Sequence, residues 1–289
     1  MTRGPHRFVL PEPVSGRDFE YIRDLVRDRT AIALDQSKVY LVNARLMPLA
    51  RGAGFGSVVD YIRHLRSQPI GEPHRRAVEA VVTTETSFFR DHFPFEALRQ
   101  EIIPELIAER RMTSRSIVIW SAGCSSGQEP YSLAMMIRES FPELATWNLR
   151  LVASDVSDGM LDRSRQGAYS QVEVNRGLPA SLLVKYFSQQ GTSWRLNDDI
   201  RSMVAFFRHN LVREAPVLPP VDVLCMRNVL IYFDLETKRK VLDRALRQLR
   251  PGGLLMLGTA ETTLNLDDRF ERVRIGRAVF YRSAERRTS

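Results

Sequence analysis

The sequence predicts an α/β protein in which a small all-α domain precedes a doubly wound, Rossmann-like sheet with a small inserted subdomain. Apolar residues recur at helical spacing, without β alternation, between residues 17 and about 90. From Ile117 onward, short apolar runs alternate with helical segments and end on acidic or amide side chains, which is typical of a doubly wound sheet. We expect a helical domain over 1–90, a linker helix over 91–116 and the sheet domain over 117–289.

The helical domain is predicted from three apolar stretches. Phe19, Ile22 and Leu25 share one helical face, and Val42 and Leu46 share another. A glycine-rich break, RGAGFGS, precedes the third stretch. The first sixteen residues have the proline and charge of a disordered segment and lack the apolar core of a signal peptide.

The composition is that of an ordinary globular protein. The chain has 289 residues and a formal net charge of +8, from 42 basic and 34 acidic residues. No apolar run approaches the roughly 18 to 20 residues that span a bilayer, so we expect a cytoplasmic protein that is not inserted in a membrane. Its 2 cysteines are too few for a disulfide framework or a zinc site, and we expect no metal.

The stretch Ile117–Met135, IVIWSAGCSSGQEPYSLAM, is the most informative segment of the chain. An apolar strand runs into a small-residue turn around Gly123, and Pro130 then opens a helix. We expect free N–H groups and the helix dipole to face a crevice where such folds bind nucleotides. Glu129 stands where a phosphate site would favour lysine, so the turn favours a ligand with amino or hydroxyl groups.

Polar residues close the next two strands. Asp155 follows Leu149–Ala153, where an acid accepts hydrogen bonds from ribose hydroxyls, although a helix cap is an alternative. Asn210 follows Val204–Arg208, where its amide would read an adenine edge or, alternatively, close a turn. Further strands and one helix are expected over Val221–Met226, Leu235–Leu249 (the helix), Leu254–Gly258, Phe270–Arg274 and Ala278–Arg282.

The segment Arg165–Met203 interrupts this alternation because it is polar and rich in glycine. We expect an inserted subdomain at about 165–203, with a short helix over Pro179–Phe187 and a few short strands. Long insertions of this kind are usually functional or disordered.

Two nucleotide-binding motifs are missing from the chain. GCSSGQ does not have the spacing of the G-x-G-x-x-G dinucleotide fingerprint, and there is no G-x-x-x-x-G-K-[ST] loop. A strand order that closes on RPGG (Arg250–Gly253) and a terminal antiparallel pair instead suit a class I S-adenosylmethionine (SAM) methyltransferase fold.

Six motifs, in order along the chain, carry a family resemblance. They are TTETSFFRD (Thr83–Asp91), WSAGCSSGQEPYSLAM (Trp120–Met135), ASDVSDGMLDRSRQGAY (Ala153–Tyr169), RHNL (Arg208–Leu211), CMRNVLIYFD (Cys225–Asp234) and LRPGGLLMLGTAE (Leu249–Glu261). With the helical domain, they cover residues 17–282 and resemble the CheR family, the glutamate methyltransferases of chemotaxis receptors.

The resemblance implies SAM-dependent methylation of glutamate side chains on the cytoplasmic helical bundle of methyl-accepting chemotaxis receptors, giving methyl esters and S-adenosylhomocysteine. We expect a monomer that acts near the inner membrane through its receptors and has no nucleic-acid partner. Together with Gly123 of the turn, the residues that the resemblance assigns to the cofactor are Thr84, Thr86, Arg90, Glu129, Asp155, Asn210, Leu211, Arg227 and Asn228.

The chain departs from the family pattern at one cofactor position. The family commonly has asparagine in N-x-T-x-FFR, whereas this chain has Thr84, so we expect altered affinity and not loss of binding. The turn around Gln189–Arg195 resembles the family type that does not grip a pentapeptide tether at receptor C-termini.

A glutamate acceptor is already ionised at neutral pH, since its reference pKa is about 4.3, and it needs no general base. Catalysis should therefore rest on alignment of the acceptor oxygen, the methyl carbon and the sulfur. Arg90 and Tyr232 are the candidate catalytic residues, because a guanidinium and a hydroxyl can orient a carboxylate. The alternative for Tyr232 is a buried aromatic side chain.

A local excess of positive charge suggests a docking site. Between Gln36 and Ile70 five basic residues face one acid, a net charge of +4. Lys38, Arg45 and Arg51 lie within about 60° of one helical face at 3.6 residues per turn. They would suit the acidic helices of receptor methylation regions, and a solvated surface is the alternative.

Two other functions remain open at this point. A nucleic-acid methyltransferase would suit the basic composition, but the chain has RNVLIY where amino-methylating DNA enzymes carry [DNS]-P-P-[YFW]. A regulatory module that binds SAM without turnover would also keep the glycine turn and its acids. A base-labile methyl ester on protein would separate both from the glutamate methyltransferase.

Overall fold

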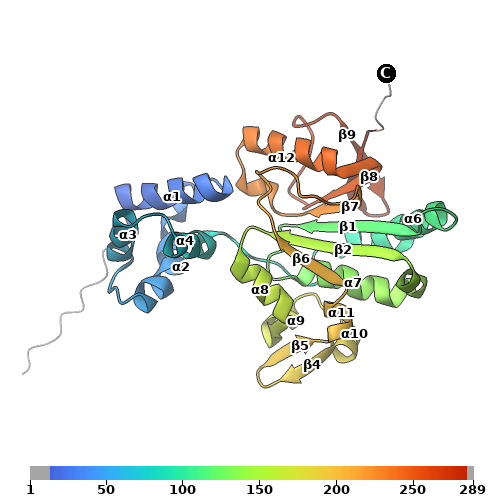
Figure 1. Cartoon of the computed structure of the whole chain (residues 1–289), viewed down its shortest axis with the longest axis horizontal. Helices are drawn as coiled ribbons and strands as arrows, with labels where there is room; N and C mark the ends of the chain where they lie inside the picture. The colour runs from blue at the N-terminus through green and yellow to red at the C-terminus, as the bar shows by residue number, and fades with distance from the viewer. Residues whose placement is uncertain (1–13, 285–289) are drawn as a thin grey trace, which may run out of the picture. The chain divides into compact units, whose positions relative to one another are not determined.

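The computed structural model describes residues 14–284, which form two compact units divided between Thr83 and Thr84 (Figure 1). The division lies earlier than the predicted end of the helical domain at residue 90. Its physical reason is Phe88, which is completely buried in the hydrophobic core of the second unit. None of the helices over residues 14–284 is both long and apolar enough to cross a bilayer.

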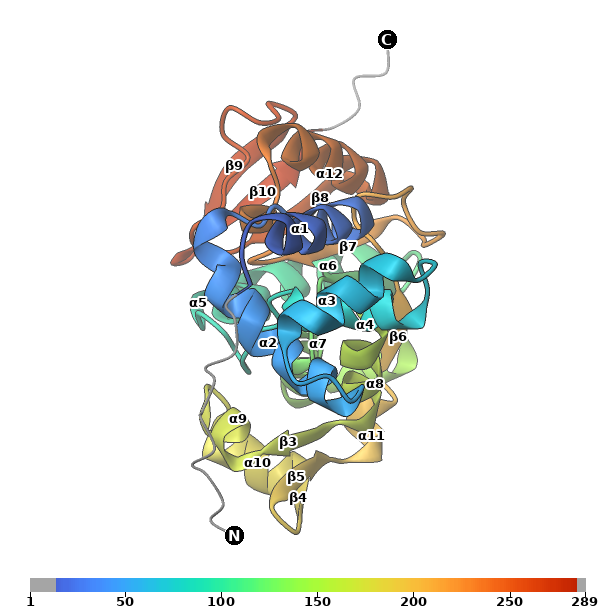
Figure 2. The same cartoon turned by 90° about the vertical axis from the view of Figure 1, so that its left-hand side faces the viewer.

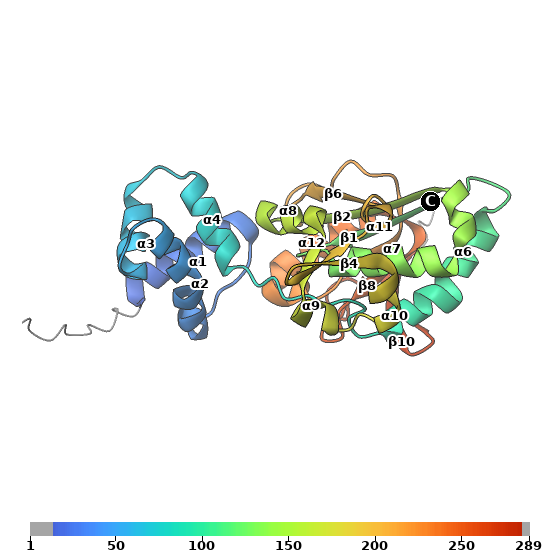
Figure 3. The same ribbon diagram turned by 90° about the horizontal axis from the view of Figure 1, so that it is seen from below.

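The first unit is all-helical, as predicted, and Figures 2 and 3 show its helices packed together. Its core residues Phe19, Ile22, Val42, Leu46 and Ile62 are completely buried, which places the predicted apolar faces inside. Its elements are α1 (Gly16–Thr30), the 3-10 turn η1 (Gln36–Lys38), α2 (Val39–Gly52), α3 (Val58–Ser67) and α4 (Glu72–Val81).

The predicted linker helix over 91–116 is helical but packs as part of the second unit's core. It consists of α5 (Phe93–Ala97), a π-helical turn η2 (Leu98–Ile102) and α6 (Ile103–Arg110). Pro104 follows the π-helical turn and has no N–H to donate to the preceding turn, which accounts for the irregular ladder. The core residues it supplies are Phe95, Leu98, Ile102, Ile103, Leu106 and Ile107.

The second unit is built on a seven-stranded mixed sheet of order β6-β2-β1-β7-β8-β10-β9. The neighbours from β6 to β8 are parallel, and β10 and β9 add an antiparallel pair at the edge. This confirms the doubly wound fold and the terminal hairpin. The strands are β1 (Ser116–Ala122), β2 (Asn148–Asp155), β6 (Val204–Arg208), β7 (Val221–Met226), β8 (Leu249–Leu257), β9 (Phe270–Ile275) and β10 (Ala278–Ser283).

Helices cover both faces of this sheet. Ile117 and Ile119 of β1 face the main core with α7 (Gln128–Ser140), whereas Trp120 faces the other side, towards α12 (Leu235–Gln248). The period-two alternation of strand side chains explains this division. Two further elements on the path are the turn η3 (Pro142–Thr146) and α8 (Asp158–Gln166).

The predicted inserted subdomain is present as a small antiparallel sheet of order β3-β5-β4 with short helices around it (Figure 1). Gly191, with φ +60°, lies in the tight turn between the two strands of its hairpin. Tyr169 and Phe187 join its core to that of the main sheet. Its elements are β3 (Ala168–Ser170), α9 (Gln171–Asn175), α10 (Ala180–Tyr186), β4 (Phe187–Gln190), β5 (Ser193–Leu196) and α11 (Asp198–Arg201).

Candidate active site

The topology places the carboxyl ends of β1, β2 and β7 beside one another, and the region above them is here called the crevice. Strands β2 and β6 lie on one side of β1, whereas β7 and β8 lie on the other. The chain therefore reverses its winding direction between β1 and β7, and open α/β sheets bind ligands at such switch points. Gly123, Asp155 and Asn228, all predicted site residues, follow or end these three strands.

The glycine turn over Gly123–Gly127 needs its glycines. Gly123 and Gly127 have φ of +78° and +92°. A Cβ on Gly123 would lie 2.7 Å from a methyl carbon of Val229, and one on Gly127 would lie 2.9 Å from the hydroxyl of Ser164. Both positions combine a left-handed backbone with close packing, which only glycine meets without strain.

Amides of this turn are bound to protein acceptors, contrary to the expectation of free N–H groups. The N–H groups of Gly123 and Cys124 both donate to the carbonyl of Ser154, at 2.8 and 2.9 Å. Ser125 N–H donates to Asp155 Oδ2 at 2.8 Å. The turn is therefore braced against β2 instead of offering these donors to a phosphate, which agrees with the absence of a P-loop motif.

Asp155 ends β2 beneath this turn and is buried. Besides Ser125, it binds the N–H of Ser157 through Oδ1 at 3.0 Å. The helix cap is Ser157, whose hydroxyl accepts from Met160 N–H in α8. Asp155 thus holds the turn and the start of the next loop, at the position where nucleotide-binding folds place a ribose-binding acid.

Glu129, in the first turn of α7, is held by two donors. Ser121 Oγ donates to Oε1 at 2.7 Å, and Arg227 Nη1 donates to Oε2 at 3.2 Å. The side chain of Glu129 is 12% exposed, so it borders the crevice. A carboxylate in this place is an acceptor for amino or hydroxyl groups of a ligand.

Arg227, a predicted cofactor residue, is a buried cation with several protein partners. Only 2% of its side chain is exposed, and its guanidinium lies between Glu129 and Asp91. Nη2 also donates to the carbonyl of Arg90 at 3.0 Å. Arg227 therefore positions Glu129 and the segment before α5, because a buried cation needs such partners.

The segment Thr84–Asp91, here called the strap, crosses the glycine turn. Ser125 Oγ donates to the carbonyl of Thr84 at 2.6 Å, and Phe89 N–H donates to Ser132 Oγ at 2.9 Å. Phe88 packs edge-to-face on Tyr169 of the subdomain, with ring centroids 5.1 Å apart. These contacts hold the strap between the sheet and the subdomain.

Thr84, Thr86 and Arg90 are half-buried in this strap. Arg90 Nη1 donates to the carbonyl of Glu85 at 3.3 Å. Phe89, Asp91 and His92 all have positive φ, of +46°, +63° and +50°. Such strained backbone persists only where neighbours enforce it, and it clusters at functional sites.

The loop after β7 carries Asn228 and Tyr232. Asn228 has φ +58°, and its Oδ1 is buried without a donor among residues 14–284. Tyr232 is half-buried at the end of a 3-10 turn, η4 (Leu230–Tyr232). Glu261 accepts backbone N–H groups of this loop, a role that sequence reasoning missed although the residue closes the sixth motif.

Asn210 and Leu211 follow β6 at the far side of the crevice and are half-buried. Asn210 Oδ1 accepts from Val212 N–H at 3.2 Å, so part of the amide closes a turn. Next to it, His209 lies against Trp120, with ring centroids 5.7 Å apart. Burial, and then the charge of Arg244, lowers the pKa of His209.

The two cysteines are buried and free. Burial raises the pKa of the Cys124 thiol, and the Asp155 and Glu129 carboxylates raise it further. Burial also raises the pKa of Cys225. Thiols of this kind are inert, so neither cysteine is a nucleophile.

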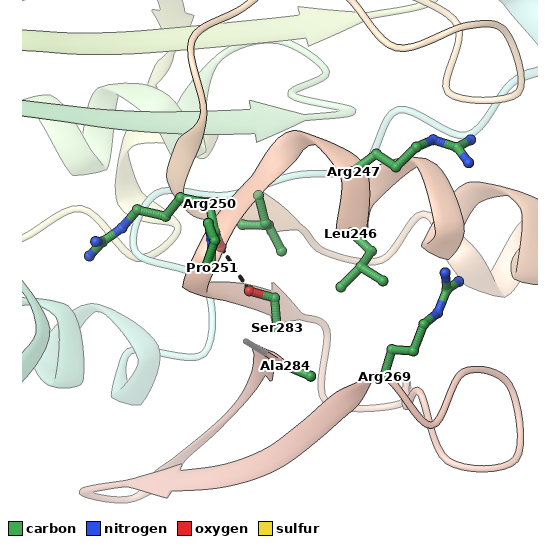
Figure 4. A pocket seen from close by; sticks show the side chains of 8 residues that line it. Leu246, Arg247, Arg250, Pro251, Arg269, Ser283 and Ala284 are labelled. Carbon is green, nitrogen blue, oxygen red and sulfur yellow. Dashed lines mark hydrogen bonds between the residues drawn. The ribbon is translucent and has the colours of Figure 1, made fainter. Parts of the chain in front are cut away.

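A separate hollow of about 310 Å³ lies beside the start of β8 (Figure 4). Ser283 Oγ donates to the carbonyl of Arg250 at its edge, at 2.8 Å. Its three arginines already have carboxylate partners: Asp243 for Arg247 and Arg269, and Asp222 for Arg250. Its lining contains none of the predicted site residues.

The predicted docking residues behave differently from one another. Arg51 is exposed and Lys38 is half-exposed on the first unit. Arg45 Nη1 instead donates to the carbonyls of Val81 and Val82 at the end of α4, at 3.2 and 2.5 Å. A cation at this end stabilises the helix dipole, so Arg45 has a structural role within its own unit.

The crevice fits the SAM that the resemblance implies. Asp155 and Glu129 supply acceptors, and Asn228 Oδ1 is a buried acceptor without a donor in the part of the chain that the structure describes. SAM carries ribose hydroxyls and an ammonium group, which are donors of the matching kind. Bracing of the turn amides removes a phosphate cradle, which SAM does not need.

Comparisons with known proteins agree with this geometry. Residues 17–82 match the model of the CheR methyltransferase all-alpha domain, and residues 84–279 match that of the CheR methyltransferase SAM binding domain. The boundary between the matches coincides with the division between the two units.

Curated relatives resemble the chain along nearly its whole length. Chemotaxis protein methyltransferase Cher2 of Pseudomonas putida is 36% identical over 271 residues, 92% of this chain and 98% of that protein. Chemotaxis protein methyltransferase 1 of Pseudomonas aeruginosa is 38% identical over 271 residues, 92% of this chain and 97% of that protein. The predicted resemblance is thereby confirmed, and the chain belongs to the CheR family of chemotaxis methyltransferases, which use S-adenosylmethionine.

Proposed function

We propose that this chain transfers the methyl group of SAM to glutamate carboxylates in the cytoplasmic helical bundle of chemotaxis receptors. The observation that carries the proposal is that the acids around the loop after β7 (Arg227–Tyr232, the acceptor loop) already have partners. Glu129 and Asp91 are paired with Arg227, and Glu261 is bound to backbone N–H groups. These acids already bind cationic or N–H donors of the protein, which suits an acceptor that needs no general base.

The roles of the site residues follow from their positions. When bound, SAM supplies a methyl group on a positively charged sulfur. Asp155 would hold the ribose hydroxyls, and Glu129 and Asn228 Oδ1 would accept from the amino group. Asn210 and Leu211 would border the adenine, and Thr84, Thr86 and Gly123 would close the crevice.

Arg90 and Tyr232 would orient the acceptor carboxylate. Both are half-buried, on the strap and on the loop after β7. A guanidinium holds a carboxylate in fixed geometry, and in-line placement contributes most of the rate when no proton has to move. Charge separation falls during methyl transfer, so exclusion of water by the strap also favours the reaction.

Receptor docking is proposed for Lys38 and Arg51 of the first unit. Their exposed positive charge complements acidic receptor helices. Arg45 is removed from this group, because its guanidinium binds the end of α4. The protein is proposed to work as a cytoplasmic monomer that reaches the membrane only through its receptors.

The proposal is tested with labelled SAM and a panel of receptor cytoplasmic fragments. Methyl transfer that mild alkali releases as methanol supports it, since esters are labile and N-methyl groups are not. Label on DNA or RNA would instead support a nucleic-acid methyltransferase. SAM binding by calorimetry without transfer to any fragment would indicate a sensing module.

A further inference from the structure

We propose that Glu261 is a positioning residue for methyl transfer: its carboxylate holds the acceptor loop, defined as Arg227–Tyr232, in its working conformation. The inference rests on the proposed function for the role of Tyr232. Glu261 lies in the loop after β8, next to the end of β7 in the sheet. It is 9% exposed.

Four backbone N–H groups converge on this carboxylate. Oε2 accepts from Asn228 and Gly258, both at 2.7 Å. Oε1 accepts from Val229 at 2.8 Å and Ile231 at 3.3 Å. Three of these donors belong to the acceptor loop, so one side chain satisfies most of the loop's inward-facing amides.

The loop needs such an acceptor because of its shape. Asn228 adopts the left-handed conformation, and η4 follows at once, so successive N–H groups point to the same side. Buried N–H groups without a hydrogen-bond acceptor destabilise the folded state. Without the Glu261 carboxylate, the loop would therefore rearrange to solvate them.

The conformation of the acceptor loop affects both the glycine turn and the position of Tyr232. Val229 packs over Gly123 so closely that a Cβ there would lie 2.7 Å from its methyl carbon. At the other end, Tyr232 N–H donates to the carbonyl of Val229 at 3.2 Å, which fixes where Tyr232 emerges. Displacement of the loop would thus move Tyr232 relative to the cofactor turn.

Glu261 is itself held on two sides. Its N–H donates to the carbonyl of Gly258 at 2.9 Å, and Tyr281 of β10 donates its hydroxyl to the Glu261 carbonyl at 3.4 Å. Gly258 leaves room for the arrangement, since a Cβ there would lie 2.8 Å from Glu261 Oε2. Because both carboxylate oxygens face backbone donors, Glu261 acts through the loop and not on the acceptor.

The first test is a double-mutant cycle with Glu261→Gln and Tyr232→Phe. Glutamine turns one pair of acceptor sites into an NH₂ group that faces N–H donors. We expect Glu261→Gln to lower kcat on the order of 10²-fold, as misplacement of a reacting group does, with a smaller change in receptor KM. Adding Tyr232→Phe to Glu261→Gln should then lower kcat by less than about threefold more, since the effects of substitutions at coupled residues are non-additive.

Hydrogen exchange supplies a readout that does not depend on the substrate. In Glu261→Gln, amides of residues 228–231 should exchange at least about tenfold faster, with amides of β1 and β2 unchanged. Glu271→Gln is the matched control, because Glu271 is an exposed glutamate on β9 of the same unit. It should leave kcat and exchange at wild-type values.

Three results would overturn the proposal: kcat of Glu261→Gln within threefold of wild type, effects that multiply in the double variant, or unchanged exchange in the loop. If Glu261→Gln does not fold, Glu261→Asp keeps the charge and retracts it by one methylene, and the same exchange criterion applies. If the wild type methylates no receptor fragment, the proposed function fails, whereas the exchange experiment still decides on the loop.

Discussion

The glycine turn and the acceptor loop face each other across the crevice, yet they are held by different means. The turn over Gly123–Gly127 has two glycines and Ser125 at its left-handed positions, and its amides bind the Ser154 carbonyl and the Asp155 side chain. The acceptor loop has Asn228 at its left-handed position, and a side-chain carboxylate binds its amides. The turn is held by a backbone carbonyl together with Asp155, whereas three amides of the acceptor loop depend on one side chain, Glu261.

Arg227 joins the two regions, so its removal should have the largest effect. Arg227→Leu would leave Glu129, whose side chain is 12% exposed, and the partly exposed Asp91 without their cation. We expect it to lower the free energy of unfolding by about 3 kcal/mol, the lower end for breaking a buried ion pair. Chemical denaturation monitored by circular dichroism measures this loss. Lys240→Leu on α12, an exposed cation paired with Glu236, is the control and should cost less than about 1 kcal/mol. Equal losses of unfolding free energy in Arg227→Leu and Lys240→Leu would contradict this role of Arg227.

Replacement of a glycine should disturb the turn strongly. Gly123→Ala places a Cβ at φ +78° and 2.7 Å from Val229, and we expect it to raise the SAM dissociation constant about tenfold. Val229→Ala removes the opposing methyl carbons and should restore part of the affinity, with the backbone strain remaining. Calorimetry measures both. Lack of any rescue would mean that backbone strain alone causes the defect.

Receptor docking through Lys38 and Arg51 should be independent of the glycine turn and of the acceptor loop. The pair Lys38→Glu and Arg51→Glu should raise receptor KM about three- to tenfold, since exposed charges steer association more than they hold it. The SAM dissociation constant should stay at its wild-type value. Arg45→Glu should instead lower the melting temperature, because it removes the cation at the end of α4. A KM unchanged by the Lys38 and Arg51 reversals would remove docking from this face.

The smallest expected effect is the dependence of stability on pH through His209. Because the pKa of His209 is lowered in the folded state, the unfolded chain binds its proton first as pH falls. Stability should therefore decline as pH drops below about 6.5, the ordinary histidine pKa. Melting temperatures across pH 5 to 8 should show a smaller decline in His209→Gln. Parallel pH profiles for the two proteins would contradict the lowered pKa.

Much of the fold was predictable because it depends on local patterns. Short apolar runs that alternate with helical segments placed the strands within a few residues, and Ser157 and Asp234 mark the helix starts through their caps. The unit boundary was misplaced because the strap has no regular periodicity. Only the burial of Phe88 against Tyr169, distant in sequence, assigns it to the second unit.

The candidate site was predictable where residue type alone reveals the role. Glycine at a left-handed turn and an acid at a strand end are recognisable in a sequence. The roles of Arg227 and Glu261 are not, since the sequence does not show whether a charged side chain binds a ligand or the protein's own groups. Their roles depend on partners from the strap and from β7, which the fold brings beside them.

The sequence by itself determined the family, the helical and α/β units and the fold class, because apolar runs, glycine turns and motifs can be recognised along the chain. Only the tertiary structure decided how the polar groups are shared. In the folded protein the turn amides bind β2, and Arg227 pairs with two acids. Arg45 binds the end of a helix, and Glu261 binds the acceptor loop. The physical reason is that a buried polar group must find a partner, and which partner lies within reach is set by packing between distant segments.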